Sequence, residues 1–291
     1  MQRLFMSGSL AGAFVAVFAS GVLAPVTVEG ASLAGSSGAK LIPHRAVYDM
    51  KLGDKDDSSG IASLTGRMVY EFSGNACDGY SVNFRFVTRF QNNDGGSQVT
   101  DLQTTSFEEP ETDSYQFLTK TFVDQELVEE SRGTAKSGAD KKTIKLKEPS
   151  EKSLEIGKEV LFPTEHLLSI LKAGEDGVPF IAADIYDGAE TGEKVYSTTS
   201  VIGAKKTSKI KADAKGPDAP LAGLNYWPVT VAYFDPEEED TAGEVMPVYQ
   251  LSFWLFQNGV SGRLTLDYGD FTIKGKMASL EIFDETDCPQ E

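Results

Sequence analysis

The sequence predicts an all-β protein built around one large antiparallel sheet. Segments that alternate apolar and polar residues recur at spacings of about 10 residues. Gly-, Asp- and Asn-rich turns separate these segments, and one later stretch alone has a helical pattern. This arrangement favours a sandwich, a barrel or a curled sheet over an α/β fold.

The N-terminal segment is predicted to lie outside the fold. Residues 1–9 contain Arg3 and no acid, and residues 10–23 are almost wholly small or apolar. A basic tip followed by an apolar run shorter than the ~20 residues of a membrane helix indicates a secretory signal peptide. We therefore expect a signal peptide and disordered leader over residues 1–34 and a single domain over residues 35–291.

The most strongly patterned strand follows the turn at Cys77. Its apolar residues share one parity and its polar residues share the other, and two residues, Val87 and Thr88, interrupt the pattern. The apolar set is Tyr80, Val82, Phe84, Phe86 and Phe90, and the polar set is Ser81, Asn83, Arg85 and Arg89. Because side chains alternate across a strand, this segment has one apolar and one polar face.

The remaining strands are predicted from the same alternation. They are expected at 45–52, 61–72, 98–107, 115–123, 126–135, 143–146, 179–186, 194–202, 225–233, 247–256, 260–268 and 271–283. Asn258-Gly259 is a strong hairpin signal between two of the last three. Residues 205–220 are polar and lysine-rich and predict a surface loop or exposed hairpin, and residues 235–240 predict an acidic loop.

One segment, residues 162–174, predicts a short helix that caps the sheet. Thr164 is the expected N-cap, Glu165 suits the positive end of the helix, and Lys172 and Gly174 suit its C-terminal end. The helix divides the domain into halves at about 40–157 and 158–291, each with about six strands.

Composition limits the classes of partner. The formal net charge is −17, from 44 acidic and 27 basic residues. Such a charge argues against nucleic-acid binding and against adhesion to anionic membrane surfaces. No segment after the signal peptide is long enough to span a bilayer as a helix, so we expect a soluble periplasmic protein.

The two cysteines, Cys77 and Cys288, are expected to form a disulfide. An isolated pair in an exported protein usually does so. A nucleophilic role is not favoured, because Cys77 has no histidine near it in sequence and Cys288 lies in an acidic tail.

The sequence predicts no catalytic residue, metal site or cofactor. His44 and His166 lack zinc-binding spacing, and no nucleophile elbow or phosphate loop occurs. A hydrolase that uses paired carboxylates is the alternative, although 44 acids make some pair findable in any case. Arg67, Arg85 and Arg89, on neighbouring strands, suggest an anion-binding cavity. The competing interpretation is cross-strand pairing with Glu71 and other acids.

Several blocks together resemble the EipB family of cell envelope integrity proteins of Gram-negative bacteria. They are Pro43–Asp49, Gly66–Phe72, Cys77–Tyr80 with Asn83–Phe86, Phe162–His166 and Tyr186–Gly188, within a match from about Leu41 to Cys288. The resemblance implies a periplasmic β-spiral, a highly twisted antiparallel sheet with an internal cavity. We expect about 12–14 strands with one or two short capping helices.

The resemblance also implies the Cys77–Cys288 disulfide, a role in envelope integrity under stress and a link to a periplasmic tetratricopeptide-repeat protein. It implies no catalytic residue. The shape is similar to that of periplasmic lipoprotein carriers, at the level of the fold alone.

We therefore predict a non-catalytic periplasmic protein that binds a protein partner or an envelope ligand, either a lipid or a glycan. Tyr80, Phe84 and Phe86 are the expected cavity lining, with Arg67, Arg85 and Arg89 at its polar side. A glycan- or peptidoglycan-acting hydrolase, a lipid or lipoprotein carrier and a purely structural scaffold are the alternatives.

Overall fold

A computed structural model describes residues 40–236, 246–284 and Cys288. The predicted signal peptide and leader, and most of the predicted acidic loop, lie outside these residues.

The described residues form one antiparallel sheet of fifteen strands. The first eight are β1 (His44–Lys55), β2 (Ile61–Asn75), β3 (Gly79–Asn92), β4 (Ser97–Glu109), β5 (Ser114–Val123), β6 (Glu126–Ser137), β7 (Lys141–Glu148) and β8 (Lys152–Gly157). The other seven are β9 (Phe180–Ile185), β10 (Tyr196–Ile202), β11 (Lys206–Thr207), β12 (Asn225–Phe234), β13 (Tyr249–Phe256), β14 (Ser261–Asp267) and β15 (Phe271–Ile282). The all-β prediction is confirmed.

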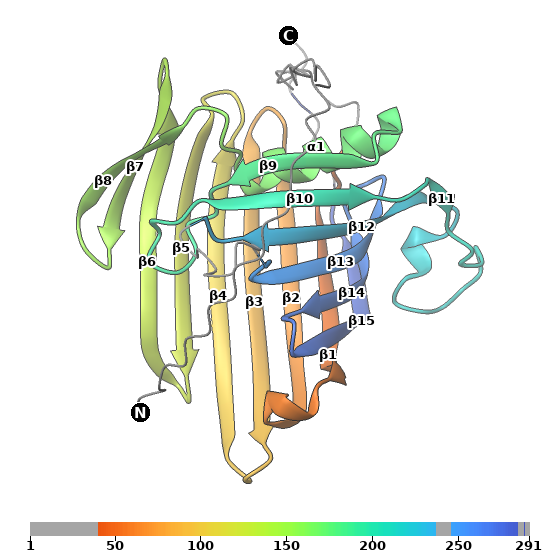
Figure 1. Ribbon diagram of the computed structural model, residues 1–291. Coiled ribbons are helices and arrows are strands. Elements are labelled where there is room, and N and C mark those ends of the chain that lie inside the picture. The colour runs from red at the N-terminus through yellow and green to blue at the C-terminus, as the bar shows by residue number, and fades with distance from the viewer. Residues whose placement is uncertain (1–39, 237–245, 285–287, 289–291) are drawn as a thin grey trace, which may run out of the picture. The chain divides into compact units, whose positions relative to one another are not determined.

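The order of the strands explains why the sheet stays open. It runs β8-β7-β6-β5-β4-β3-β2-β1-β15-β14-β13-β12-β10-β9, with β11 paired to β12. The first and last strands pair in the middle, and β8 and β9 form the two free ends. A twisted sheet of this size curls instead of lying flat. Figure 1 shows β9, β10, β12 and β13 crossing in front of β2 and β3.

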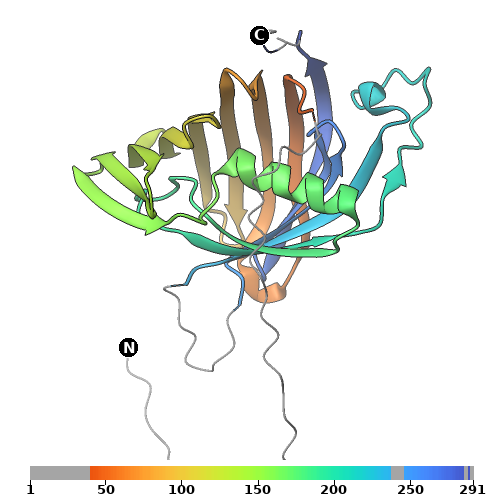
Figure 2. The same cartoon turned by 90° about the horizontal axis from the view of Figure 1, so that it is seen from above.

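The helix α1 (Pro163–Asp176) connects the two ends of the sheet and lies inside the curl (Figure 2). The predicted N-cap at Thr164 is wrong, because Phe162 is the N-cap residue and the Glu165 carboxylate accepts the Phe162 N–H at 2.9 Å. The helix also runs past Gly174 and ends at Asp176, and Gly177, with a φ of 73°, is its C-cap residue.

Two clusters of buried side chains hold the sheet together. The larger lies along the face that α1 covers, which we call the inward face, and includes Tyr48, Phe72 and Trp227. The smaller lies beneath β5–β7 and includes Tyr115, Phe117 and Tyr186. Eight strands precede α1 and seven follow it, so the prediction of about six in each half was low.

Candidate functional site

The predicted cavity residues of β2 and β3 lie on opposite faces of the sheet. Tyr80 is 7% exposed and stacks on Phe72, and Phe84 and Phe86 pack half-buried against the larger core. The arginines of the same strands point outward, because side chains alternate along a strand. The structure therefore does not bring the aromatic and arginine sets together in one cavity.

Two of the outward arginines, Arg67 and Arg85, pair with aspartates on neighbouring strands, whereas Arg89 is exposed and forms no ion pair among the described residues. Arg67 donates to Asp49 at 2.8 Å, and Arg85 contacts both oxygens of Asp101 at 3.0 and 2.7 Å. The hydrogen bond from Arg85 lowers the pKa of the Asp101 carboxyl. Glu71, named above as a pairing partner, faces Arg45 at 3.9 Å. These contacts are the cross-strand pairing that competed with the anion-site interpretation.

Val87 and Thr88, which interrupt the apolar–polar pattern of β3, still follow the alternation of its side chains between the two faces of the sheet. Thr88 lies inward and is buried, opposite Gly66 on β2, whereas Val87 lies on the outward face. A side chain at Gly66 would meet the Val87 carbonyl and the Thr88 methyl, so glycine makes room for this β-branched pair.

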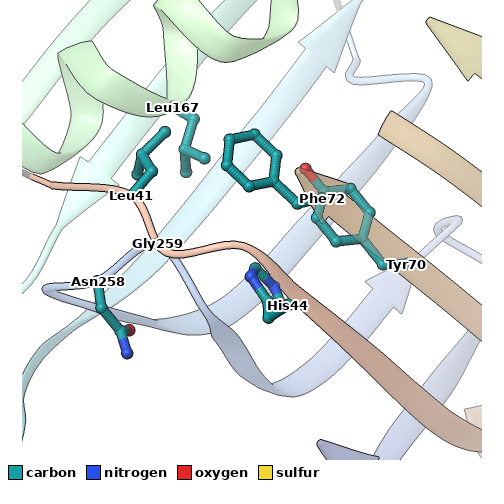
Figure 3. A pocket seen from close by; sticks show the side chains of 7 residues that line it. All are labelled: Leu41, His44, Tyr70, Phe72, Leu167, Asn258 and Gly259. Carbon is teal, nitrogen blue, oxygen red and sulfur yellow. The ribbon is translucent and has the colours of Figure 1, made fainter. Parts of the chain in front are cut away.

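A small crevice lies beside the start of β1 on the inward face (Figure 3). Its lining joins the N-terminal segment, β1, β2, α1 and the β13–β14 turn: Leu41, His44, Tyr70, Phe72, Leu167, Asn258 and Gly259. It is too tight to admit a water molecule. His44 is buried there, and its Nδ1 lies 2.8 Å from the Ile42 carbonyl oxygen. Burial lowers the pKa of the His44 imidazole, which favours its neutral form.

A buried carboxylate holds the N-terminus of α1. Glu108 on β4 is 4% exposed, and its two oxygens accept the backbone N–H groups of Thr164 and Glu165 at 2.8 and 2.9 Å. These groups are among the helix donors that have no partner within the helix. Burial raises the pKa of Glu108 to about 7, against the opposing effect of the Thr164 and Glu165 hydrogen bonds.

A buried lysine lies beside that helix terminus. Lys142 on β7 is 2% exposed, and its Nζ lies 2.8 Å from Asp113 Oδ1 and 3.4 Å from Glu165 Oε2. The same ammonium stands 3.9 Å from the centroid of the Phe162 ring. Lys142 was not predicted from the sequence as a functional residue, because it follows another lysine in a polar segment. Its burial could have been predicted from its position two residues before Ile144, because residues two apart on a strand point to the same face.

The second histidine is also a packed residue. His166 on α1 is buried, and its Nε2 lies 3.3 Å from the Ser200 hydroxyl. Burial lowers the pKa of His166 to about 4. Within the described residues, no cluster of histidine, cysteine and carboxylate side chains has the arrangement of a metal site.

The turn after β9 closes the smaller core. Tyr115 donates to the Asp187 carbonyl at 3.0 Å, and the Ser131 hydroxyl donates to the Gly188 carbonyl. Gly188 has φ of 69°, and a side chain there would collide with the Phe117 ring. The turn needs glycine for both reasons.

A wider hollow of about 400 Å³ lies on β3–β7. Two of its residues, Ser81 and Asn83, belong to the set of β3 side chains that point outward. Eight of its twelve lining residues have polar side chains, although more of the surface that they expose is apolar than polar; the lining is Ser81, Asn83, Thr105, Ser106, Phe107, Gln116, Phe117, Leu118, Arg132, Gly133, Thr134 and Lys147. Arg132 contacts Glu148 at 3.4 Å. This hollow, which we call the outer hollow, can present hydroxyl, amide and cationic groups to a ligand.

The structure pairs Cys77 with Cys288 as a disulfide, with the two Cα atoms 5.7 Å apart. Cys77 lies in the β2–β3 turn, where its N–H donates to the Asn75 side chain at 2.8 Å. The bond fixes the segment after β15 to the end of the β2–β3 hairpin.

Comparison with known proteins identifies the family. The family model described as EipB-like matches residues 36–284. The chain belongs to the EipB-like family. It is 43% identical over 249 residues to the cell envelope integrity protein EipB of Brucella abortus (strain 2308), covering 86% of this chain and 87% of that protein.

A solved structure shares the fold. The β-barrel-like protein of a domain of unknown function, DUF1849, from Brucella abortus superposes with a TM-score of 0.76 at 41% identity. The match covers 84% of this chain and all of that one. The EipB-like match includes the outer hollow and the α1 terminus. Within the described ranges, no helix is long and apolar enough to cross a bilayer.

Proposed function

We propose that this EipB-like protein is an exported, non-catalytic protein that supports cell envelope integrity by binding a polar envelope component, a glycan, in the outer hollow. The name of the Brucella relative supports the envelope role, and the apolar N-terminal segment and paired cysteines support export to the periplasm. The lining of the outer hollow is the observation that carries the choice of ligand.

That lining suits a sugar better than an acyl chain. Asn83, Thr105 and Gln116 are exposed and offer amide and hydroxyl groups, which match the hydroxyls of a glycan. Arg132 and Lys147 add positive charge that favours an anionic substituent. Acyl chains need an enclosed apolar cavity, and the inward crevice of Figure 3 has no room for one.

Catalysis by paired carboxylates has less support. None of the described residues that line the outer hollow is an aspartate, a glutamate or a histidine. Burial raises the pKa of the Glu108 carboxyl, but both of its oxygens accept backbone N–H groups of α1. A glycosidase acid must reach the leaving-group oxygen of its substrate, and Glu108 faces the core.

A protein partner acts alongside the glycan in this proposal. The partner we expect is a periplasmic tetratricopeptide-repeat protein. Cross-linking in cells followed by purification under denaturing conditions tests this separately. Recovery of other proteins without any repeat protein would remove it.

The glycan proposal is tested with purified soluble peptidoglycan fragments and isothermal titration calorimetry. We expect the double variant Asn83→Ala/Gln116→Ala to bind about 10- to 30-fold more weakly, from the loss of two hydrogen bonds. The matched control is Ser63→Ala/Gln91→Ala, which removes an outward, hydrogen-bonded pair on β2 and β3 away from the hollow.

Growth under detergent stress tests the role in envelope integrity separately from glycan binding. If a deletion strain fails to grow and the parent gene restores its growth, the envelope function is supported. Equal affinity of the two double variants, or no binding by the parent, would exclude the outer hollow as the glycan site.

A further inference from the structure

A concentrated positive charge lies in the segment between β10 and β12. Residues 204–216 contain five lysines and one acid, Asp213, so their net charge is 5 − 1 = +4 in a chain whose net charge is −17. The lysines are Lys205, Lys206, Lys209, Lys211 and Lys215, and we call this segment the lysine loop.

The lysines are free to meet an external partner. All five are exposed, and none forms an ion pair with an acid among the residues that the structure describes. Elsewhere the lysines of strands often have one, such as Lys141 with Glu155 at 2.7 Å. Lys205 also stands 5.4 Å from the centroid of the Trp227 ring.

The loop is held in place at its base. Lys206 and Thr207 form β11 against β12, and the Ser208 N–H donates to the Leu224 carbonyl at 2.8 Å. Ile210 packs half-buried against the larger core, between two exposed lysines. Figures 1 and 2 show the segment around β11 projecting from the side of the sheet. The charges are therefore presented away from the body of the sheet on an anchored segment.

The residue type indicates the class of partner. Arginine is the side chain that recognises a carboxylate or phosphate bidentately, and the loop contains none. Lysines act as point charges, and a run of them responds to surface charge density. We propose that the lysine loop binds the surface of a bilayer rich in anionic phospholipid headgroups.

The net charge of the chain does not cancel this attraction. At physiological ionic strength the Debye length is about 8 Å, so acids farther away than that are largely screened. Asp213 and Asp218 are the acids within the segment and its immediate continuation. The net charge of the chain argues against adhesion to an anionic membrane, but the local positive charge of the lysine loop decides whether this part of the surface binds one.

Vesicle co-sedimentation of the full mature chain tests the proposal. The vesicles contain phosphatidylcholine alone or with about one-third phosphatidylglycerol, at low and at physiological salt. The loop variant replaces all five lysines of the loop with glutamine. The control variant replaces, also with glutamine, five exposed lysines of the strands that lie outside the outer hollow and have no ion pair among the described residues: Lys51, Lys55, Lys136, Lys145 and Lys276.

The two variants have the same net charge, −17 − 5 = −22. We expect the parent and the control variant to bind the anionic vesicles and the loop variant to lose at least about tenfold in partitioning. Raising the salt should weaken binding by the parent and control proteins. Circular dichroism checks that both variants keep the β spectrum of the parent.

Three outcomes would overturn the proposal. They are absence of parent binding to anionic vesicles, equal binding to neutral vesicles, and equal losses in the two variants. Loop-dependent retention on immobilised polyglutamate without vesicle binding would instead assign the loop to an acidic protein.

Discussion

The inward and outward faces of β2–β7 use ionic contacts under very different conditions. On the outward face, Arg85 and Asp101 are joined by two hydrogen bonds, and the arginine is largely in water. On the inward face, Glu108 and Lys142 are almost fully buried and hold the N-terminus of α1. Because desolvation raises the cost of an unpartnered charge, the inward contacts should matter most to stability, although both faces contain well-formed pairs.

The largest expected effect is at the buried lysine. Lys142→Ala should lower the free energy of unfolding by about 4 kcal/mol, because it removes a buried cation from Asp113 and Glu165 and leaves a void. The control is its neighbour Lys141→Ala, which breaks an exposed pair with Glu155 and should cost less than about 1 kcal/mol.

Urea unfolding monitored by fluorescence measures both Lys142→Ala and Lys141→Ala. Similar losses in the two variants would show that the faces do not differ. Lys142→Met keeps most of the side-chain volume, so a smaller loss than for Lys142→Ala separates packing from charge.

The next effect is a pH dependence from Glu108. Its folded pKa of about 7 lies above the ordinary value of 4.5, so the native state binds the proton more tightly. Its contribution to stability is therefore complete below pH 4.5 and is lost as the pH rises to about 7, by about 3 kcal/mol.

Glu108→Gln should flatten this part of the stability profile, measured by urea unfolding at a series of pH values. Glu109→Gln removes a charge from the adjacent, half-buried position of β4 and serves as the control. An unchanged slope between pH 4.5 and 7 in Glu108→Gln would contradict the assignment.

The smallest effect is expected on the outward face. Arg85→Ala and Asp101→Asn should each cost less than about 1 kcal/mol, because the arginine is exposed and salt screens the pair. A double-mutant cycle at low and high salt gives the coupling energy directly. A coupling energy between Arg85 and Asp101 as large as the stability loss in Lys142→Ala would show that ionic contacts on the two faces do not differ in strength.

Most of the strands could be predicted because their alternation and turns are local properties of the chain. The β3 pattern and the Asn258-Gly259 hairpin are examples. The edge strand β8 was not predicted, since its six residues combine short length with weak alternation. The cap of α1 was misplaced by two residues, because Glu108 satisfies the amide of Thr164 from a distant strand.

The candidate site was less predictable than the fold. The alternation of side chains correctly placed Phe84 and Phe86 on the face opposite Arg85. The sequence does not show which of the two faces packs against a second layer of structure. The outer hollow joins residues of β3–β7, and its existence depends on how the sheet twists. The inward placement of Lys142 required a register that only the paired strands supply.

The Cys77–Cys288 bond has a consequence for the order of events during biogenesis. The two residues are 211 positions apart, and Cys288 follows all of the described strands in the sequence. In the export from the N-terminus that we propose, the thiol of Cys77 emerges while β3 to β15 are still to be delivered. The native bond therefore cannot form until the last strand has crossed, and a non-reducing gel of the export intermediates would record completed translocation. On this proposed route Cys77 is open during that interval to mixed disulfides with other thiols of the compartment, so we expect oxidoreductases that reverse such bonds to assist its folding.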